Sequence, residues 1–228
     1  MKRIVENLFL LESSGTNIFL VVGTKDLTMV DTGDAPSVDG LLSEMAENGW
    51  SWDDVGRVVL THADPESAGG LSVLLAKRPV RVFAHPKEVP FLTGAKPMPE
   101  SGGFFAKRKR KKAFPFDPVE SVMPAEPGIP PTGFPHWQVL YTPGHSHGSL
   151  SFYDPVKQIL ICGDALTNDG GTLAISEEGV DTAQLRKSVE AIAKMDVDIL
   201  CPARGPVVRS GAFRFIEPLL EAGSKPKD

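Results

Sequence analysis

The chain lacks the features that define disulfide-rich, membrane and nucleic-acid-binding proteins. It contains 2 cysteines in 228 residues, which is too few for a disulfide framework and is typical of a reducing cytosol. No run approaches the roughly 18 apolar residues that suggest a membrane span. The formal net charge of −5 argues against general binding of nucleic acid. These absences leave a soluble globular protein.

The N-terminus also lacks the pattern of a signal peptide. Lys2 and Arg3 precede an apolar stretch, but polar residues interrupt it, so the continuous apolar core of such a peptide is missing. We therefore expect a cytoplasmic location. With 41% apolar and 23% charged residues, the composition is that of a soluble globular protein, and we expect one domain over residues 1–228. Nothing in the sequence indicates an oligomeric state.

Short apolar runs alternate with helical patterns along most of the chain. We predict strands at residues 18–22, 27–30, 58–60, 80–84, 137–141, 149–153, 158–162 and 198–201. We predict helices between Ser37, as N-cap, and Gly49, after Gly69-Gly70, and over residues 182–195. Strands that alternate with helices predict an α/β architecture, in which functional residues lie on loops at the strand ends.

Residues 94–135 differ from the rest of the chain. They carry Gly102-Gly103, many prolines and a run of six basic residues at 107–112, with four phenylalanines around it. We predict a long inserted loop within the domain. Such a basic run is more often solvated than a recognition site, although a lid over an anionic ligand is an alternative. Nucleic acid is the weaker alternative, because the chain as a whole is acidic.

Four loops, each after an apolar run, hold nearly all the unusual polar residues. They are Asp31-Thr32-Gly33, residues 61–70 with His62, residues 142–149 with His145 and His147, and Cys162-Gly163-Asp164. A lone histidine is usually structural. Two histidine-bearing loops beside acidic strand ends instead predict a metal-binding or catalytic site.

The order and the amino-acid sequences of these loops resemble the motifs of the metallo-β-lactamase superfamily. The resemblance covers almost the whole chain, from Thr16-Asn17 through the four loops to residues 202–206. It implies the fold of that family, which is a four-layer αββα sandwich with the site between its two sheets. We therefore expect an α/β protein with this architecture.

The metal loop departs from the usual family pattern, T-H-x-H-x-D-H-x-G-G. The first histidine is kept as His62, but Asp64 stands at the position of the second histidine. Glu66 stands at the aspartate position, and Ser67 replaces the third histidine. The other loops keep His145 and the bridging aspartate, Asp164, whereas Arg204 replaces the final histidine.

The departures fall mainly on one of the two metal sites that the resemblance implies. The first site comprises the positions of His62, Asp64, His145 and Asp164, and all four can bind a metal. The second site comprises the positions of Glu66, Ser67, Arg204 and the shared Asp164. Because serine is a poor ligand and arginine is none, we expect at most one divalent ion. Zinc is the first expectation, with iron or manganese as alternatives.

Arg204 is predicted to act as a fixed cation where the second metal ion would be. A divalent ion about 4 Å from a guanidinium would be repelled by about 8 kcal/mol at an effective dielectric constant near 20. The guanidinium can pair instead with Asp164 or Glu66. We hypothesise that this pairing replaces the second metal ion.

The resemblance suggests hydrolysis of a small ester, thioester or lactone, including anionic ones. Glu66 would orient or deprotonate water, Asp164 would hold the metal, and Arg204 would bind an oxyanion or a substrate carboxylate. One alternative is a metal-free pseudoenzyme or ligand-binding module of the same fold. Another is a mononuclear iron oxidoreductase, because His62, His145 and Asp164 match the iron-binding positions of the superfamily's persulfide dioxygenases.

Several of the candidate residues also have simpler interpretations. Asp64 is favoured as a ligand, with the cap of a following helix as the alternative. Asp31 is expected to order a neighbouring ligand rather than bind metal. His147 is expected at the surface or against substrate, with a replacement ligand as the alternative. Structural roles are expected for four other residues, namely His85, His136, Cys162 and Cys201.

Overall fold

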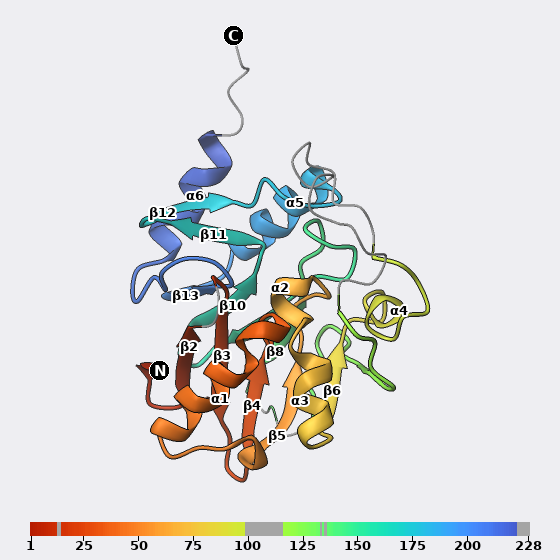
Figure 1. Ribbon diagram of the computed structural model, residues 1–228. Coiled ribbons are helices and arrows are strands. Elements are labelled where there is room, and N and C mark those ends of the chain that lie inside the picture. The colour runs from red at the N-terminus through yellow and green to blue at the C-terminus, as the bar shows by residue number, and fades with distance from the viewer. Residues whose placement is uncertain (13–14, 99–115, 133, 135, 223–228) are drawn as a thin grey trace.

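The computed structural model describes residues 1–12, 15–98, 116–132, 134 and 136–222 (Figure 1). The basic run at 107–112 lies outside these residues, so neither the solvated loop nor the alternative of a lid is described. The parts of the predicted insertion that are described contain a short strand, β7 (Met123–Pro124), which extends the large sheet.

The N-terminal half forms a seven-stranded mixed sheet. Its strands lie side by side in chain order: β1 (Lys2–Val5), β2 (Leu8–Glu12), β3 (Asn17–Val22), β4 (Leu27–Val30), β5 (Val55–Val59), β6 (Arg81–Ala84) and β7. The pairs from β1 to β4 are antiparallel, and those from β4 to β7 are parallel. The loops after β5 and β6 therefore leave the same edge of the sheet.

The C-terminal half forms a second mixed sheet and a hairpin. The sheet has the order β13 (Ile199–Pro202), β10 (Ile159–Gly163), β9 (Leu150–Asp154) and β8 (Gln138–Tyr141). Only the β10–β13 pair is parallel. The hairpin consists of β11 (Leu166–Asp169) and β12 (Thr172–Ile175).

Helices cover the outer face of each sheet. The larger sheet is associated with α1 (Val38–Glu47), α2 (Pro65–Ala68), α3 (Leu71–Lys77), α4 (Val89–Leu92) and two 3₁₀ turns, Ala35–Ser37 and Trp52–Asp54. The smaller sheet is associated with α5 (Thr182–Ile192) and α6 (Phe213–Ala222). Figure 1 shows α1 and α3 in front of the larger sheet, at the opposite side from the smaller one.

Three apolar clusters separate these four layers. The outer two join α1 and α3 to the larger sheet and α5 and α6 to the smaller sheet. The middle cluster joins the facing sides of the sheets, for example through Phe19 and Phe152, which are both buried. Burial of apolar surface between layers is the main force that holds such a stack together. The predicted αββα sandwich is therefore confirmed.

The predicted strands all correspond to observed strands and differ only at their ends. The predicted helix over 182–195 ends earlier, at Ile192. Ser37 stands at the N-cap position of α1, but its side chain makes no capping bond; Asp34 caps the preceding turn instead. Sequence patterns did not indicate eight of the described elements: β1, β2, β7, β11, β12, α2, α4 and α6.

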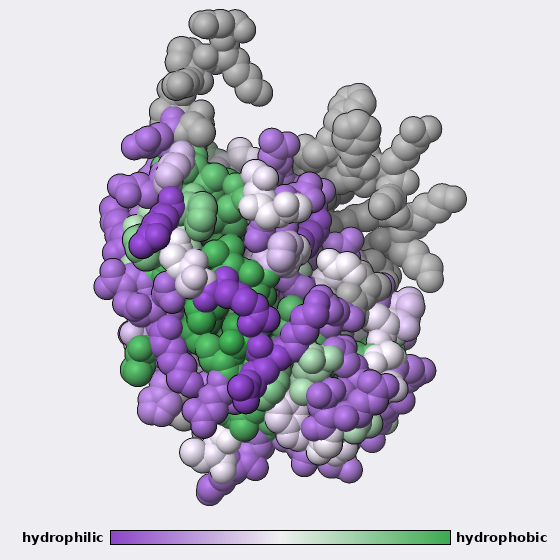
Figure 2. All heavy atoms as spheres, turned by 90° about the vertical axis from the view of Figure 1, so that its left-hand side faces the viewer, coloured by the Kyte–Doolittle hydropathy of each residue, from purple (hydrophilic) through white to green (hydrophobic). Residues whose placement is uncertain are grey.

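One side of the sandwich is lined by the edge strands of both sheets, β1 and β13. Arg209, after β13, donates to the carbonyl oxygen of Arg3 on β1 at 3.2 Å. Half-buried Ile4, Val5 and Val207 pack against the middle cluster here. Figure 2 shows this side, where apolar side chains reach the surface between polar ones. Within the described residues, no helix has the length and apolar character that a membrane span requires.

Gly144 fixes the approach of the His145 loop to α5. Its φ angle is +133°, and its carbonyl oxygen accepts from the backbone nitrogen of Asp181, the N-cap residue of α5, at 2.9 Å. A Cβ atom at this position would lie 2.2 Å from the backbone nitrogen of Leu185. Only glycine satisfies both the dihedral angle and the close contact.

We predict that Gly144→Ala lowers the free energy of unfolding by about 3 kcal/mol or more, because it adds backbone strain to an overlap with α5. Gly40→Ala is the matched control, since Gly40 lies within α1 and a Cβ atom added there would meet nothing within 4 Å. That change should raise stability by about 0.5–1 kcal/mol. Urea denaturation of both variants measures the difference; equal stabilities would contradict this packing.

Candidate metal centre

The four loops predicted from the sequence meet where the two sheets come together. His62 follows β5 of the larger sheet, and Asp64 comes just before α2. His145 lies between β8 and β9, and Asp164 follows β10, both in the smaller sheet. Residues from both sheets therefore contribute to one site, as predicted.

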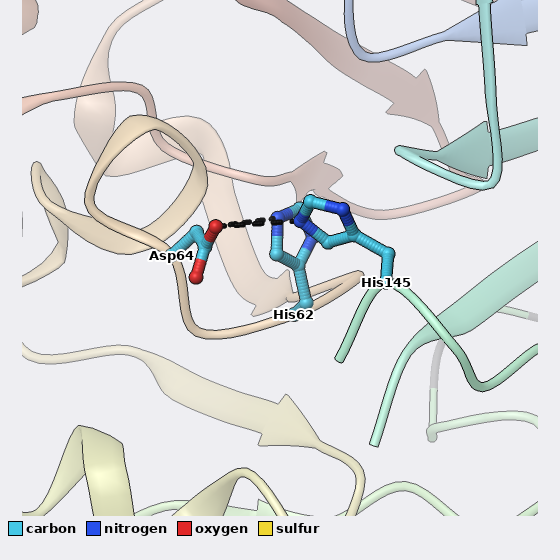
Figure 3. A group of neighbouring side chains, drawn as sticks. All are labelled: His62, Asp64 and His145. Atoms are coloured by element: carbon cyan, nitrogen blue, oxygen red, sulfur yellow. Dashed lines mark hydrogen bonds and ion pairs between the residues drawn. The ribbon is translucent and has the colours of Figure 1, made fainter. Parts of the chain in front are cut away.

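The two imidazoles converge with the carboxylate of Asp64 (Figure 3), and the carboxylate of Asp164 lies against the same two rings. Nε2 of His145 lies 3.3 Å from Oδ2 of Asp64 and 3.5 Å from Oδ2 of Asp164. Nε2 of His62 lies 4.0 Å and 3.6 Å from the same two atoms. The ligand atoms of His62, Asp64 and His145 all lie within 4.8 Å of one another. The prediction that these residues meet is confirmed.

A buried hydrogen-bond chain orients His62. The hydroxyl of Thr61 donates to Oδ2 of Asp31 at 2.8 Å and lies 2.9 Å from Nδ1 of His62. Since the hydroxyl proton is used on the carboxylate, its oxygen accepts from the protonated Nδ1. Nε2 then faces the site with a free lone pair, the form in which imidazole binds a metal. Asp31 has the ordering role that the sequence predicted.

His145 is oriented by the backbone of a loop far along the chain. Its Nδ1 lies 2.8 Å from the carbonyl oxygen of Glu178. A carbonyl oxygen can only accept, so Nδ1 donates and carries a proton. Nε2 of His145 therefore points at the carboxylates, as Nε2 of His62 does. Glu178 was not predicted from the sequence.

The pKa values reflect burial and the nearby acids. Burial, with the charge of His145, lowers the pKa of His62 to about 4. Burial would also lower the pKa of His145, but the hydrogen bond to Asp64 and the charges of Asp164 and Asp64 outweigh it and raise the pKa to about 9. Burial raises the pKa of Asp31 to about 7, against the hydrogen bonds from Thr61. The carboxylates therefore favour the charged form of His145, whereas burial favours the neutral form of His62.

The donor atoms present fit a divalent ion. Zinc with bonds of about 2.0–2.2 Å to a tetrahedral ligand set separates its ligand atoms by about 3.3–3.6 Å. The contacts around Asp164 and His145 fall in this range. Oδ1 of Asp164 is buried and has no hydrogen-bond partner among the described residues. A buried carboxylate oxygen without a donor is costly, and a bound cation would satisfy it.

Asp64 faces the imidazoles and does not cap the helix that follows it. It stands at the N-cap position of α2, but its side chain makes no capping hydrogen bond. Its Oδ2 faces the two imidazoles instead (Figure 3). The interpretation of Asp64 as a helix cap is therefore wrong.

Arg204 lies beside this group and contacts three carboxylates. Its Nη2 lies 3.1 Å from Oδ2 of Asp164 and 3.0 Å from Oε2 of Glu66, and its Nη1 lies 3.2 Å from Oε2 of Glu178. Burial alone would lower the pKa of Arg204, but these three negative charges raise it. The pairing with Asp164 and Glu66 was expected, whereas the contact with Glu178 was not.

Two asparagines hold the loop that carries Arg204. Nδ2 of Asn17 donates to the carbonyl oxygens of Pro202 and Gly205, at 2.9 and 2.7 Å. On the other side, the backbone nitrogen of Asn168 donates to the carbonyl of Arg204 at 3.1 Å. Asn17 belongs to the segment whose resemblance to the family was noted, but no local pattern marked Asn168.

The remaining candidates contribute no atom to the converging group, although Ser67 contacts it. His147 is exposed, and its carbonyl oxygen accepts from the hydroxyl of Tyr141. His85 stacks on Tyr141, with ring centroids 4.7 Å apart. Ser67 is buried, 3.5 Å from Nε2 of His62. Cys162 and Cys201 are buried free thiols, as predicted; burial raises the pKa of Cys162 to about 12.

Comparison with known proteins agrees with this fold. The metallo-beta-lactamase superfamily model matches residues 12–204, so the chain belongs to this superfamily. The probable metallo-hydrolase YflN of Bacillus subtilis (strain 168) is 23% identical over 146 residues, which cover 60% of this chain and 54% of YflN. The hydroxyacylglutathione hydrolase of Francisella tularensis subsp. novicida (strain U112) is 39% identical over 67 residues, 29% of this chain and 26% of that protein.

Solved structures of the same fold cover nearly the whole chain. The crystal structure of TTHA1623 in a di-iron-bound form has a TM-score of 0.69 and 27% sequence identity, and the match covers 96% of this chain and 98% of TTHA1623. By contrast, the match spans only about half the length of YflN and a quarter of the Francisella enzyme.

We predict that Thr61→Val lowers the free energy of unfolding by about 2–4 kcal/mol. The change keeps the shape of the side chain but leaves Asp31 and Nδ1 of His62 without their shared hydroxyl, and each buried group left unpaired costs about 1–3 kcal/mol. Thr61→Ser keeps the hydroxyl and should restore most of the loss. Urea denaturation measures the free energy of unfolding of both variants. A valine variant as stable as the serine variant would show that the Thr61 hydroxyl does not maintain the hydrogen bonds between Asp31 and His62.

Proposed function

We propose that this chain is a metal-dependent hydrolase that binds at most one divalent ion, at His62, Asp64, His145 and Asp164. Arg204 stands where the second ion of the family would bind. The observation that carries the proposal is the 3.1 Å contact between Nη2 of Arg204 and Oδ2 of Asp164, the carboxylate that the two metal sites would share.

Electrostatics supports one cation in addition to the guanidinium. A second divalent ion about 4 Å from Arg204 would meet a repulsion of about 8 kcal/mol at an effective dielectric constant near 20. Glu66 and Glu178 have solvent-exposed side chains and offset part of this. Ser67 and Arg204 offer no strong ligand atom. The second metal site therefore has too few ligands to offset the rest of this repulsion.

A bound divalent ion would supply a more acidic bound water and polarise a carbonyl group. The other roles fall to the chain's own residues. Glu66 is positioned next to Arg204, where its carboxylate accepts a proton from the attacking water and returns it to the leaving group. The guanidinium has five N–H donors, so it can bind an oxyanion or a substrate carboxylate in addition to its present partners.

The substrate we propose is a small ester, thioester or lactone that carries an anionic group. The fixed charge of Arg204 at the edge of the metal group supports an anionic substrate. The names of the relatives support hydrolysis, and that of hydroxyacylglutathione hydrolase supports an acyl compound with charged groups. Zinc is the proposed metal, although the di-iron form of TTHA1623 makes iron the alternative.

We predict about one metal ion per chain, measured by elemental analysis of protein purified without added metal. In the double variant Ser67→His, Arg204→His, the content should rise toward two, because two imidazoles replace a poor ligand and a cation. The Arg204→Ala variant is the control, since it removes the charge without adding a ligand. A double variant that still holds one ion would contradict the role assigned to Arg204.

Elemental analysis also distinguishes the hydrolase from the two alternatives, an iron oxidoreductase and a metal-free pseudoenzyme. Stoichiometric iron together with oxygen consumption would favour the oxidoreductase, because two histidines and one carboxylate are the ligand set of non-haem iron oxygenases. Protein that contains no metal, and whose melting temperature Zn²⁺ does not raise, would favour the pseudoenzyme.

We predict that Arg204→Ala lowers kcat/KM for a carboxylate-bearing ester about 10–100-fold more than for its neutral analogue, because a charged hydrogen bond contributes about 1.5–3 kcal/mol. Arg209→Ala is the matched control: Arg209 is the same residue type but contacts Arg3 at the sandwich edge. Equal losses on the charged and neutral esters would show that Arg204 does not bind the substrate anion.

A further inference from the structure

Glu88 is a buried carboxylate that the proposed reaction does not use. It lies in the loop between β6 and α4, and 2% of its surface is exposed. No ion pair with Glu88 is present among the described residues. A buried carboxylate without a cation is expensive, and an apolar side chain would fill the same space at less cost. Its presence therefore calls for a specific role.

The hydrogen bonds that the Glu88 carboxylate accepts come from the two histidine-bearing loops. Its Oε2 accepts from the backbone nitrogen of Ala63 at 3.1 Å. Its Oε1 accepts from the backbone nitrogen of Gly148 at 2.7 Å and from the hydroxyl of Ser146 at 2.8 Å. Ala63 lies between His62 and Asp64 in the chain, and Ser146 directly follows His145. One carboxylate thus joins the loop that carries His62 and Asp64 to the loop that carries His145.

The His145 loop is built closely around this carboxylate. A Cβ atom at Gly148 would lie 2.5 Å from Oε1 of Glu88, so a side chain at this position would displace the carboxylate. The hydroxyl of Ser149 accepts from the backbone nitrogen of Ser146 at 2.9 Å, which closes the turn. The loop that begins at His145 therefore binds the Glu88 carboxylate and also contains a proposed metal ligand, His145 itself.

The chemistry of the contacts requires a carboxylate. Backbone N–H groups donate to both oxygens, to Oε2 from Ala63 and to Oε1 from Gly148. Glutamine has the same shape, but its amide must place an NH₂ group against one of these donors. An isosteric amide therefore satisfies one loop at most.

We infer that Glu88 is a positioning residue that sets the separation of the His62–Asp64 loop from the His145 loop and thereby the affinity of the site for a divalent ion. This inference rests on the proposed metal site. Glu88 does not touch the ion; it acts through the backbone on both sides of it, and such outer partners commonly change metal affinity about 10–100-fold.

The test is a titration of metal-free protein with Zn²⁺ against a competing chelator, together with the visible absorption spectrum of the Co²⁺-loaded protein. We expect Glu88→Gln to weaken Zn²⁺ binding about 10–100-fold and to shift the Co²⁺ bands, because the ligands are less well placed. Ser146→Ala removes one of the three hydrogen bonds and should weaken binding less. Glu47→Gln, at the exposed end of α1, should leave both measurements unchanged.

A folded Glu88→Gln protein with wild-type Zn²⁺ affinity and Co²⁺ spectrum would overturn the inference. If that variant does not fold, Ser146→Ala decides, and unchanged Zn²⁺ affinity there has the same consequence. A wild-type protein that binds neither ion would overturn this inference and the proposed metal site together. A wild-type protein that binds Zn²⁺ but hydrolyses no substrate would overturn only the hydrolase, and the affinities of the Glu88 variants would still stand.

Discussion

The site depends on one constraint, which is that buried carboxylates between the two sheets must be neutralised. Asp164 is buried, and its Oδ2 contacts two imidazoles and a guanidinium. Its other oxygen has no donor among the described residues. Because an unpaired buried charge is costly, Asp164 needs positive charge or hydrogen-bond donors nearby. The contacts with His145, whose pKa is raised, and with Arg204 meet this requirement, whereas neutral His62 faces the site with a lone pair.

The same requirement extends to the residues behind the metal group. Asp31, Glu88 and the carbonyl oxygen of Glu178 each accept from a group in a ligand-bearing loop. Each therefore orients a loop that carries a proposed ligand, and none of them is itself among the proposed ligands. Rigid positioning of this kind sets metal affinity and the orientation of imidazoles. The sandwich makes this positioning possible, because its packed layers fix the relative positions of the strand ends from which these loops leave.

Membership of the metallo-beta-lactamase superfamily sets the expectation of a metal site, and the residues of this chain modify it. The related fold of TTHA1623 has been seen with two iron ions. In this chain a guanidinium is placed against Asp164, in contact with Glu66 as well. A permanent cation needs no cofactor supply and cannot dissociate, so it would give the site a fixed anion-binding group beside an exchangeable ion.

Local sequence patterns were sufficient to predict an α/β protein and to place His62, Asp64, His145 and Asp164 in loops after strands. The αββα sandwich and the candidate metal ligands were implied by the resemblance of these loop motifs to the metallo-β-lactamase superfamily, because such motifs are properties of short segments. The roles of Glu88 and Glu178 emerge only from the folded chain, because their contacts join residues 25 to 60 positions apart and a carbonyl oxygen carries no sequence signal. Packing brings such groups together, and no local pattern records it.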